Sequence, residues 1–177
     1  MLKIDVTVRG TAPLLMNRFD DAAHPENESK KKQKVYKDKE EAEARLYLDN
    51  KENLVQPAIH FESAMIKAAA AFKFEGKKTY KDAFKGGIFV RPDLIVHKNQ
   101  KWEIDRKPVI VQRARIMRAR PRLDEWELDF SIDVIDERIA DHVVKEVLEY
   151  TGLYVGVGDM RPRFGRLEVT NFTVKEK

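Results

Sequence analysis

The chain has 177 residues, carries a formal net charge of +4 and contains no cysteine. The absence of cysteine excludes disulfide frameworks, thiolate zinc sites and cysteine nucleophiles. No apolar run approaches the ~20 residues that span a bilayer, and the first residues alternate apolar and polar side chains, unlike a signal peptide. We therefore expect one soluble cytoplasmic domain over residues 1–177 without membrane contact, and the charged fraction of 36% favours a thermophilic source.

The positive charge is concentrated in two short segments. Residues 106–122 hold seven basic side chains and no acidic one, and three more arginines stand at 161, 163 and 166. The rest of the chain is therefore net acidic. A local basic field on an acidic body is typical of proteins that bind a polyanion. The alternative is that these arginines extend from a strand face into solvent and bind nothing.

Hydrophobic periodicity predicts the elements of the first half of the chain. Residues 3–9 alternate apolar and polar side chains, as a half-buried strand does. Residues 20–45 are rich in Lys and Glu, so we expect a flexible, charged, basic insertion with helical tendency. A small hairpin with Asp49–Asn50 as its turn is predicted over 46–55, and an amphipathic helix over 59–74.

The second half is predicted to consist mainly of strands. Residues 77–87 are interpreted as a basic connector, and residues 88–97 as an edge or a bulged strand, since Pro92 interrupts them. A β-branched run over 109–117 and a strictly alternating segment over 126–134 predict two long strands. We expect them to form a hairpin around a bend at Pro121.

The remaining elements complete the expected fold. A helix starts at Asp136 and stops at Gly152, and a last strand covers 167–174. This order predicts an α+β fold of the ferredoxin-like βαββαβ type, an antiparallel sheet with two helices on one face, with an added hairpin and the charged insertion near residues 20–45. The other sheet face is then open, and single-stranded RNA often lies on such faces.

The strongest local signal is the segment from residue 152 to 169, GLYVGVGDMRPRFGRLEV. Its glycines let the backbone approach a ligand, its N–H groups can form an anion nest, and its arginines can hold phosphate oxygens. The residues concerned are Gly156, Gly158, Gly165, Arg161, Arg163 and Arg166. A helix precedes the segment and a strand follows it, which excludes a dinucleotide-binding fingerprint. The alternative is a tight helix-to-strand connection without a ligand.

This segment resembles the C-terminal glycine-rich loop of the RAMP superfamily, the ferredoxin-like or RRM-like RNA-binding proteins of CRISPR systems. Two other stretches, 55–70 and 6–15, are similar to the Pro-start helix and the first strand and loop of the backbone subunits in that superfamily. The resemblance implies a CRISPR-associated, antiviral RNA-binding protein that assembles head to tail as a repeated subunit. A phage or mobile-element relative with the same fold is the alternative.

The second signal is a stripe of arginines with the two-residue spacing of a strand. Two of them share one register and three share another: Arg113 and Arg115, then Arg118, Arg120 and Arg122. Along an extended strand such residues stand roughly 6–7 Å apart, which matches successive phosphates of a single strand. Phe164 and Tyr154 are candidates for stacking on bases.

The remaining candidates lie in the first half of the chain. Arg18 and Lys31 belong to a basic segment that we expect to order around nucleic acid. The nucleases of the RAMP superfamily often use an early histidine as general base, which makes His24 and His60 candidates by resemblance. No histidine pair has the spacing of a metal site, so neither a metal nor a cofactor is expected.

We therefore expect a non-catalytic protein that binds the phosphate backbone of single-stranded RNA or DNA. Its partners would be the nucleic acid and copies of itself or other subunits of a ribonucleoprotein complex. Two alternatives remain: a metal-independent RNA endonuclease, and a phage or mobile-element assembly protein whose basic patch meets an acidic protein.

Overall fold

The computed structural model describes residues 1–19 and 38–176, and within this part it has four helices and three antiparallel sheets. The helices are α1 (Asp38–Ala44), α2 (Ala58–Ala69), α3 (Lys81–Gly87) and α4 (Asp141–Tyr150), and a π-helical turn, η2 (Thr151–Val155), extends α4. The strands are β1 (Leu2–Gly10), β2 (Leu14–Leu15), β3 (Val55–Pro57), β4 (Ile88–Arg91), β5 (Leu94–Val96), β6 (Glu103–Val111), β7 (Ala114–Leu123), β8 (Glu127–Val134) and β9 (Leu167–Glu176). The expected α+β class is confirmed.

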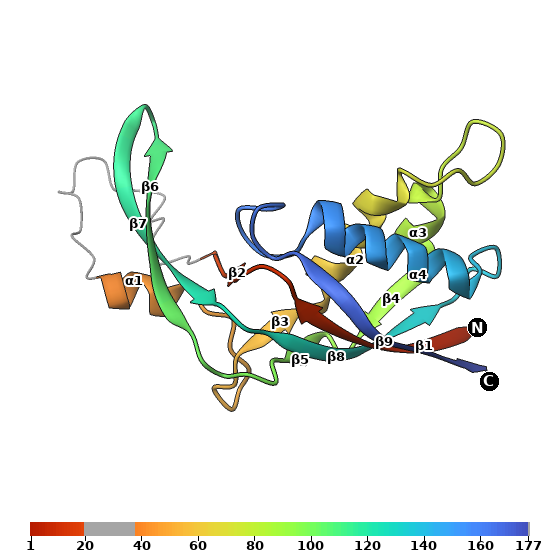
Figure 1. Ribbon diagram of the computed structural model, residues 1–177, viewed down its shortest axis with the longest axis horizontal. Coiled ribbons are helices and arrows are strands. Elements are labelled where there is room, and N and C mark those ends of the chain that lie inside the picture. The colour runs from red at the N-terminus through yellow and green to blue at the C-terminus, as the bar shows by residue number, and fades with distance from the viewer. Residues whose placement is uncertain (20–37, 177) are drawn as a thin grey trace.

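The largest sheet has the spatial order β4-β8-β1-β9, and each neighbouring pair is antiparallel. Helices α2 and α4 lie side by side on one face of this sheet (Figure 1). The alternation in β1 has the predicted effect, since Ile4, Val6 and Val8 are buried opposite the apolar residues of β8. Each such buried side chain contributes about 1.5–3 kcal/mol relative to an exposed one.

Both helices bury an apolar stripe against this sheet. Phe61 of α2 packs on Phe130 of β8 with ring centroids 4.7 Å apart, and α4 buries Val144, Val147 and Leu148. The helices are shorter than predicted. The one predicted over 59–74 ends at Ala69, and the one predicted from Asp136 begins five residues later because the Asp136 carboxylate accepts the Arg138 N–H in a separate turn.

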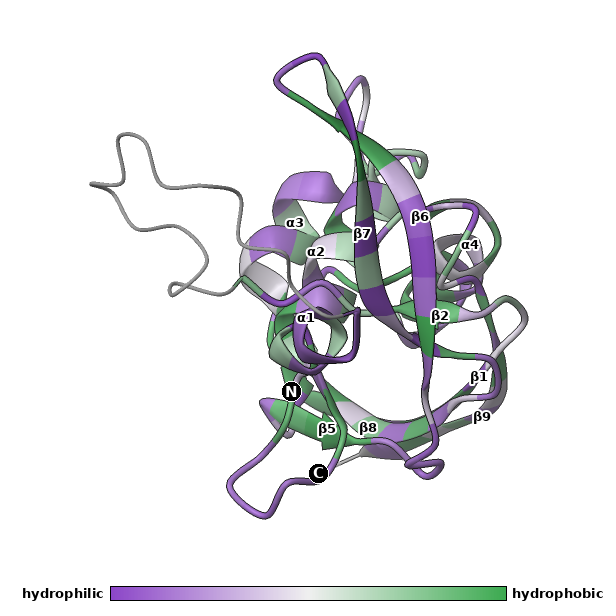
Figure 2. Cartoon of the chain, turned by 90° about the vertical axis from the view of Figure 1, so that its left-hand side faces the viewer, coloured by the Kyte–Doolittle hydropathy of each residue, from purple (hydrophilic) through white to green (hydrophobic). Residues whose placement is uncertain are grey.

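The hairpin of the second sheet differs from the prediction. Strands β6 and β7 pair from Glu103–Arg122 to Val111–Ala114, so the turn lies at Gln112 and Arg113, both with positive φ. The predicted bend at Pro121 is wrong, because Pro121 lies inside β7. The hairpin projects from the body of the molecule and has a hydrophobic stretch just below its polar tip (Figure 2).

The stretch predicted as one edge or bulged strand over 88–97 divides at a cis peptide bond before Pro92. Its first half, β4, joins the large sheet, and its second half, β5, pairs with β3. The preceding connector contains helix α3. The small hairpin is present as a bridge between Leu48 and Leu54, with backbone hydrogen bonds from Asp49 to Asn53 and from Val55 to Tyr47 on either side of it. The Asp49 side chain also accepts the backbone N–H groups of Lys51 and Asn53.

Most of the predicted charged insertion, 20–37, lies outside the described residues. The part that is described includes α1, which is packed against β7. Glu41 of α1 is buried, and its carboxylate accepts the backbone N–H of Ala119 and pairs with Arg118 of β7. This end of the insertion is therefore attached to the root of the hairpin.

His97 is a buried histidine that should make stability depend on pH. Its side chain is 1% exposed, and neither ring nitrogen has a hydrogen-bond partner among the described residues. Burial lowers the pKa of His97 from 6.5 to about 4. The unfolded chain therefore binds a proton between these pH values that the folded chain does not, and stability should fall as the pH decreases through this window.

We predict that His97→Leu flattens this decline. The histidine should contribute a loss of about 3 kcal/mol when the pH falls from 7 to 4, at 1.36 kcal/mol per pKa unit. Urea unfolding of the wild-type protein and the variant at several pH values measures the difference. Titration of the carboxylates changes the stability of both proteins by the same amount, so it does not contribute to this difference. Parallel curves for the two proteins would contradict a neutral, buried His97.

Candidate nucleic-acid interface

The glycine loop, residues 156–166, is held tightly against neighbouring backbone. The N–H of Asp159 donates to the carbonyl of Leu15, and the N–H of Gly165 donates to the carbonyl of Pro13. The N–H of Val157 donates back to Gly165 across the loop. The expected anion nest is therefore not formed by these amides, because their N–H groups are already used inside the protein.

The glycines serve this packing. Gly165 has a φ of +75°, and a Cβ there would stand 1.7 Å from the carbonyl oxygen of Val157. Gly158 has a φ of +81°, and a Cβ there would stand 2.6 Å from the carbonyl oxygen of Leu15. Gly156 likewise has a positive φ. The glycines let the loop close on itself and on β2, and the loop then presents its arginines from a fixed backbone.

The arginine stripe of β7 is neutralised along the root of the hairpin. Arg118 pairs with Glu41, and Arg120 Nε lies 2.6 Å from Asp159 Oδ2 in the glycine loop. Arg122 pairs with Asp124 and Asp105, at 2.6 and 3.6 Å. Arg118, Arg120 and Arg122 therefore have little free charge to offer a phosphate track, and the prediction for these three gains no support. Their partners are distant in sequence, apart from Asp124, and Arg120 joins the stripe directly to the loop.

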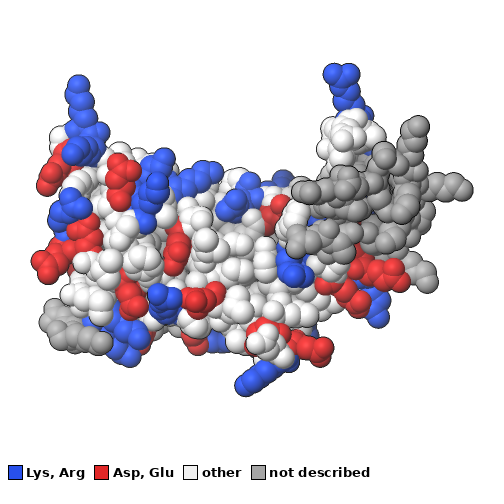
Figure 3. Space-filling model, turned by 180° about the vertical axis from the view of Figure 1, so that it is seen from behind, with Lys and Arg blue, Asp and Glu red and all other residues white. Residues whose placement is uncertain are grey.

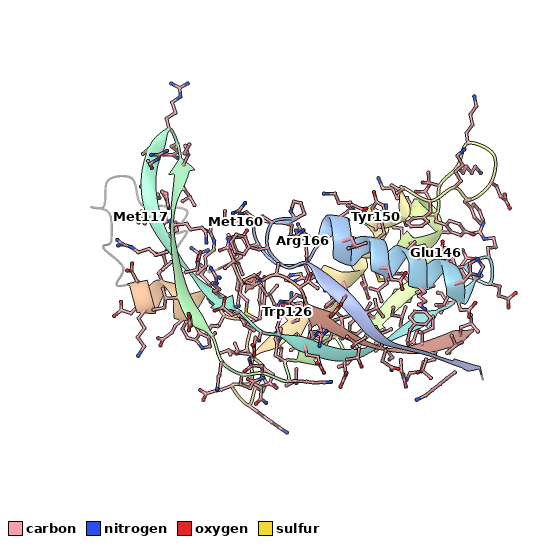
Figure 4. The ribbon with its side chains drawn as sticks, viewed as in Figure 1. Met117, Trp126, Glu146, Tyr150, Met160 and Arg166 are labelled. Atoms are coloured by element: carbon pink, nitrogen blue, oxygen red, sulfur yellow. The ribbon has the colours of Figure 1, made fainter. Side chains whose placement is uncertain are left out.

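A second group of arginines forms no ion pair within residues 1–19 and 38–176. We call this group the arginine surface; its members are Arg18, Arg113, Arg115, Arg161, Arg163 and Arg166, and all are exposed. Lys and Arg side chains line the edge of the molecule between its two projections, at the top of Figure 3. Figure 4 shows Arg166 at the return of the loop into β9 and Met160 on the side of the loop toward the hairpin. The loop arginines and the hairpin tip therefore remain candidates for binding phosphate.

The two aromatic candidates have different surroundings. Phe164 is only 7% exposed, and Lys107 Nζ lies 4.5 Å from its ring centroid. Because the residue is buried, the expected stacking role gains no support, and the ring instead packs inside the loop. Tyr154 of η2 is 62% exposed and leans on Tyr150, with centroids 4.7 Å apart. This ring remains open to a ligand.

The open face of the large sheet carries cations that are already paired. Arg9 pairs with Glu168, and Lys175 pairs with Asp5 on the neighbouring strand. Lys98 bridges two carboxylates of β8. Because these three cations are matched by neighbouring carboxylates, this face offers a polyanion much less attraction than the arginine surface. The expectation that RNA lies on the open sheet face gains no support.

Sequence reasoning missed a pocket of about 140 Å³ between β2, the N-terminus of α2 and the glycine loop, which we call the His60 pocket. Residues that line it include Met16, Asn17, Tyr47, Gln56, His60 and Arg161. Gln56 Nε2 lies 2.7 Å from His60 Nδ1, and the ring of Tyr47 meets that of His60 edge to face with centroids 5.2 Å apart. Burial, and secondly the charge of Arg161, lower the pKa of His60, so the imidazole is neutral at pH 7.

The other candidates of the first half cannot be placed. Lys31 and His24 lie outside the described residues. Within the described ranges, no group of three or more acidic or histidine side chains has the arrangement of a metal site. None of the helices described is both long and apolar enough to cross a membrane.

No protein-family model matches the chain, and a search of curated proteins finds no similar sequence.

The packing of the glycine loop leads to a test by substitution. Gly165→Ala should destabilise the protein by more than about 2 kcal/mol, because it adds a steric clash to the strain of a positive φ. Gly76→Ala is the matched control. Its φ is +56° but no atom lies within 4 Å of the added Cβ, so it should cost about 1 kcal/mol. Urea unfolding midpoints report both values, and equal costs would refute the close contact.

Proposed function

We propose that the protein binds single-stranded nucleic acid, RNA in the first place, through the arginine surface. The observation that carries this proposal is a contrast between two groups of arginines. Those of the sheet face and the root of the hairpin are matched with carboxylates. Those of the glycine loop and the hairpin tip are exposed and, within the described part of the chain, unpaired. Like charges grouped without counter-charges repel one another, and a polyphosphate ligand relieves that repulsion.

The rigidity of the glycine loop supports the same proposal. Its backbone is bonded to the carbonyls of Pro13 and Leu15, so Arg161 and Arg163 start from fixed positions. A preorganised site loses less conformational entropy when it binds. Guanidinium groups hold phosphate oxygens in a bidentate manner, and such contacts carry no sequence information. The bulk of the affinity should therefore depend strongly on salt and little on sequence.

We also infer that the large sheet with α2 and α4 is a ferredoxin-like core. The chain order β1, α2, β4, β8, α4, β9 and the spatial order β4-β8-β1-β9 correspond to a βαββαβ plan with both crossing helices on one face. Together with the resemblance of the glycine loop to that of the RAMP superfamily, this plan supports a role as a repeated subunit of a cytoplasmic ribonucleoprotein. An antiviral, CRISPR-associated setting is a part of this proposal.

One observation favours a second function, a metal-independent RNA endonuclease. His60 is neutral at pH 7, lies in a pocket and has Arg161 beside it, as a general base near a phosphate would. The pocket is less suited to supply the general acid that such a reaction also needs. Tyr47 also lines the pocket, but burial raises the pKa of its hydroxyl, which makes it a weaker acid. Binding without cleavage is therefore the function that we favour.

The binding proposal predicts a change in salt dependence. In Arg161→Ala/Arg163→Ala, the slope of log affinity for single-stranded RNA against log salt should decrease in magnitude by about 1.4, at roughly 0.7 for each lost phosphate contact. Fluorescence anisotropy over a range of salt concentrations measures this slope.

A control with the same change in net charge is Arg9→Ala/Arg138→Ala. These arginines pair with Glu168 and Asp136 and lie outside the arginine surface. This variant should keep the wild-type slope. If both variants lose the same slope, or neither does, the glycine loop does not hold the strand.

One incubation with RNA distinguishes binding from cleavage. We expect labelled hairpin RNA, mixed with the purified protein in EDTA, to migrate as an intact, shifted complex on a native gel and as full-length RNA on a denaturing gel. Cleavage products that disappear in His60→Ala would establish the endonuclease instead. A protein that neither shifts nor cleaves RNA or single-stranded DNA would contradict both.

A further inference from the structure

The His60 pocket contains a buried hydrogen-bond acceptor that the protein does not satisfy. Gln56 is 1% exposed, and its Nε2 is committed to His60 Nδ1 at 2.7 Å. Its Oε1 is buried and has no hydrogen-bond partner in the described part of the chain. A buried acceptor without a partner is costly, and native structures contain few of them. Gln56 lines the pocket, so a shift of its side chain that brings Oε1 to the pocket wall would let a ligand N–H donate to it and remove that cost.

The walls of the pocket suit a flat ring. The rings of Tyr47 and His60 stand nearly perpendicular, at 81°, and Met16 also lines the pocket. Aromatic rings and a methionine sulfur make favourable contacts with a π-system. A cavity of about 150 Å³ is known to hold one benzene ring. The volume here, about 140 Å³, therefore accepts one six-membered ring better than the fused rings of a purine.

The mouth of the pocket adjoins the arginine surface. Arg161 is exposed and lines the pocket, and the charge of Arg18 acts on the hydroxyl of Tyr47. A ring inside the pocket would therefore have cations beside it, where the phosphate of a nucleotide carries its negative charge. A ring with an N–H edge joined to an anion describes a nucleotide of a single strand, whose bases are free to turn out of the stack.

We propose that the His60 pocket holds one pyrimidine base of the bound strand, with Gln56 Oε1 accepting an N–H from its Watson–Crick edge. Cytosine offers its 4-amino group and uracil its N3–H, so both fit this acceptor. The proposal rests on the nucleic-acid binding proposed above and adds a position of base preference to it. Gln56 is then a specificity-determining residue, and Arg161 orients the adjoining phosphate.

The wild-type protein with single nucleotides provides the first test. We expect UMP and CMP, followed by NMR, to shift the side-chain amide signals of Gln56 and the imidazole signals of His60. AMP at the same concentration should leave them unchanged. Equal shifts with AMP, or no shift with either pyrimidine nucleotide, would overturn the proposal. This test needs no variant and does not depend on binding of a longer strand.

The second test uses oligonucleotides of equal length. The wild-type protein should bind oligo-U and oligo-C about fivefold more tightly than oligo-A, as one additional hydrogen bond gives. Gln56→Leu has a similar volume but no acceptor, and it should bind all three with the affinity of oligo-A. Circular dichroism checks that this variant folds; if it does not, the nucleotide titration of the wild-type protein decides.

The failures of the two proposals can be told apart. Binding of all oligonucleotides with equal affinity would remove the base pocket and leave the arginine surface as the nucleic-acid site. Absence of any binding to oligonucleotides would remove the proposed function. A preference for pyrimidines that persists in folded Gln56→Leu would show that another part of the protein reads the base.

Discussion

The arrangement of the whole molecule depends on β2, a strand of only two residues. Leu14 and Leu15 are fully buried and pair with the end of β7. On their other side, the carbonyls of Pro13 and Leu15 accept the N–H groups of Gly165 and Asp159. One short segment therefore joins the root of the hairpin to the glycine loop. Together with the ion pair between Arg120 and Asp159, this connection fixes the relation of two basic segments that are separated by about 40 residues in the sequence.

This connection explains why the basic stretch has two different roles. Near β2, where several segments of the chain pack together, an unpaired guanidinium group would be partly desolvated. A desolvated charge is costly in free energy unless an opposite charge pairs with it. Arg118, Arg120 and Arg122 are accordingly paired with carboxylates there. Farther out, at the hairpin tip and on the exposed side of the loop, solvent removes that requirement. Among the described residues, the exposed arginines without an ion pair therefore lie at the periphery of the joint, where an extended ligand can reach them.

The sequence was informative where one face of an element is buried along its whole length. The two-residue alternation of β1 and β8 and the apolar stripe of α4 predicted those elements and the α+β class. The alternation is also present in β7, where Ala119 and Leu123 are buried between arginines, but a proline at position 121 favours a bend when only the sequence is considered. The ion pairs with Glu41 and Asp159 could not be predicted, because they depend on tertiary contacts. The same holds for the His60 pocket, since a glutamine in a three-residue strand gives no sign that it is buried.

The most direct test of the account is a map of where a single strand touches the protein. Photo-crosslinking of a uridine-containing RNA to the wild-type protein, followed by mass spectrometry of the peptides, provides that map. The account predicts crosslinks to the peptides that contain Tyr47, Tyr154 and the glycine loop. Crosslinks confined to the open face of the sheet, on β1, β8 and β9, would contradict it, and so would crosslinks spread evenly over the surface.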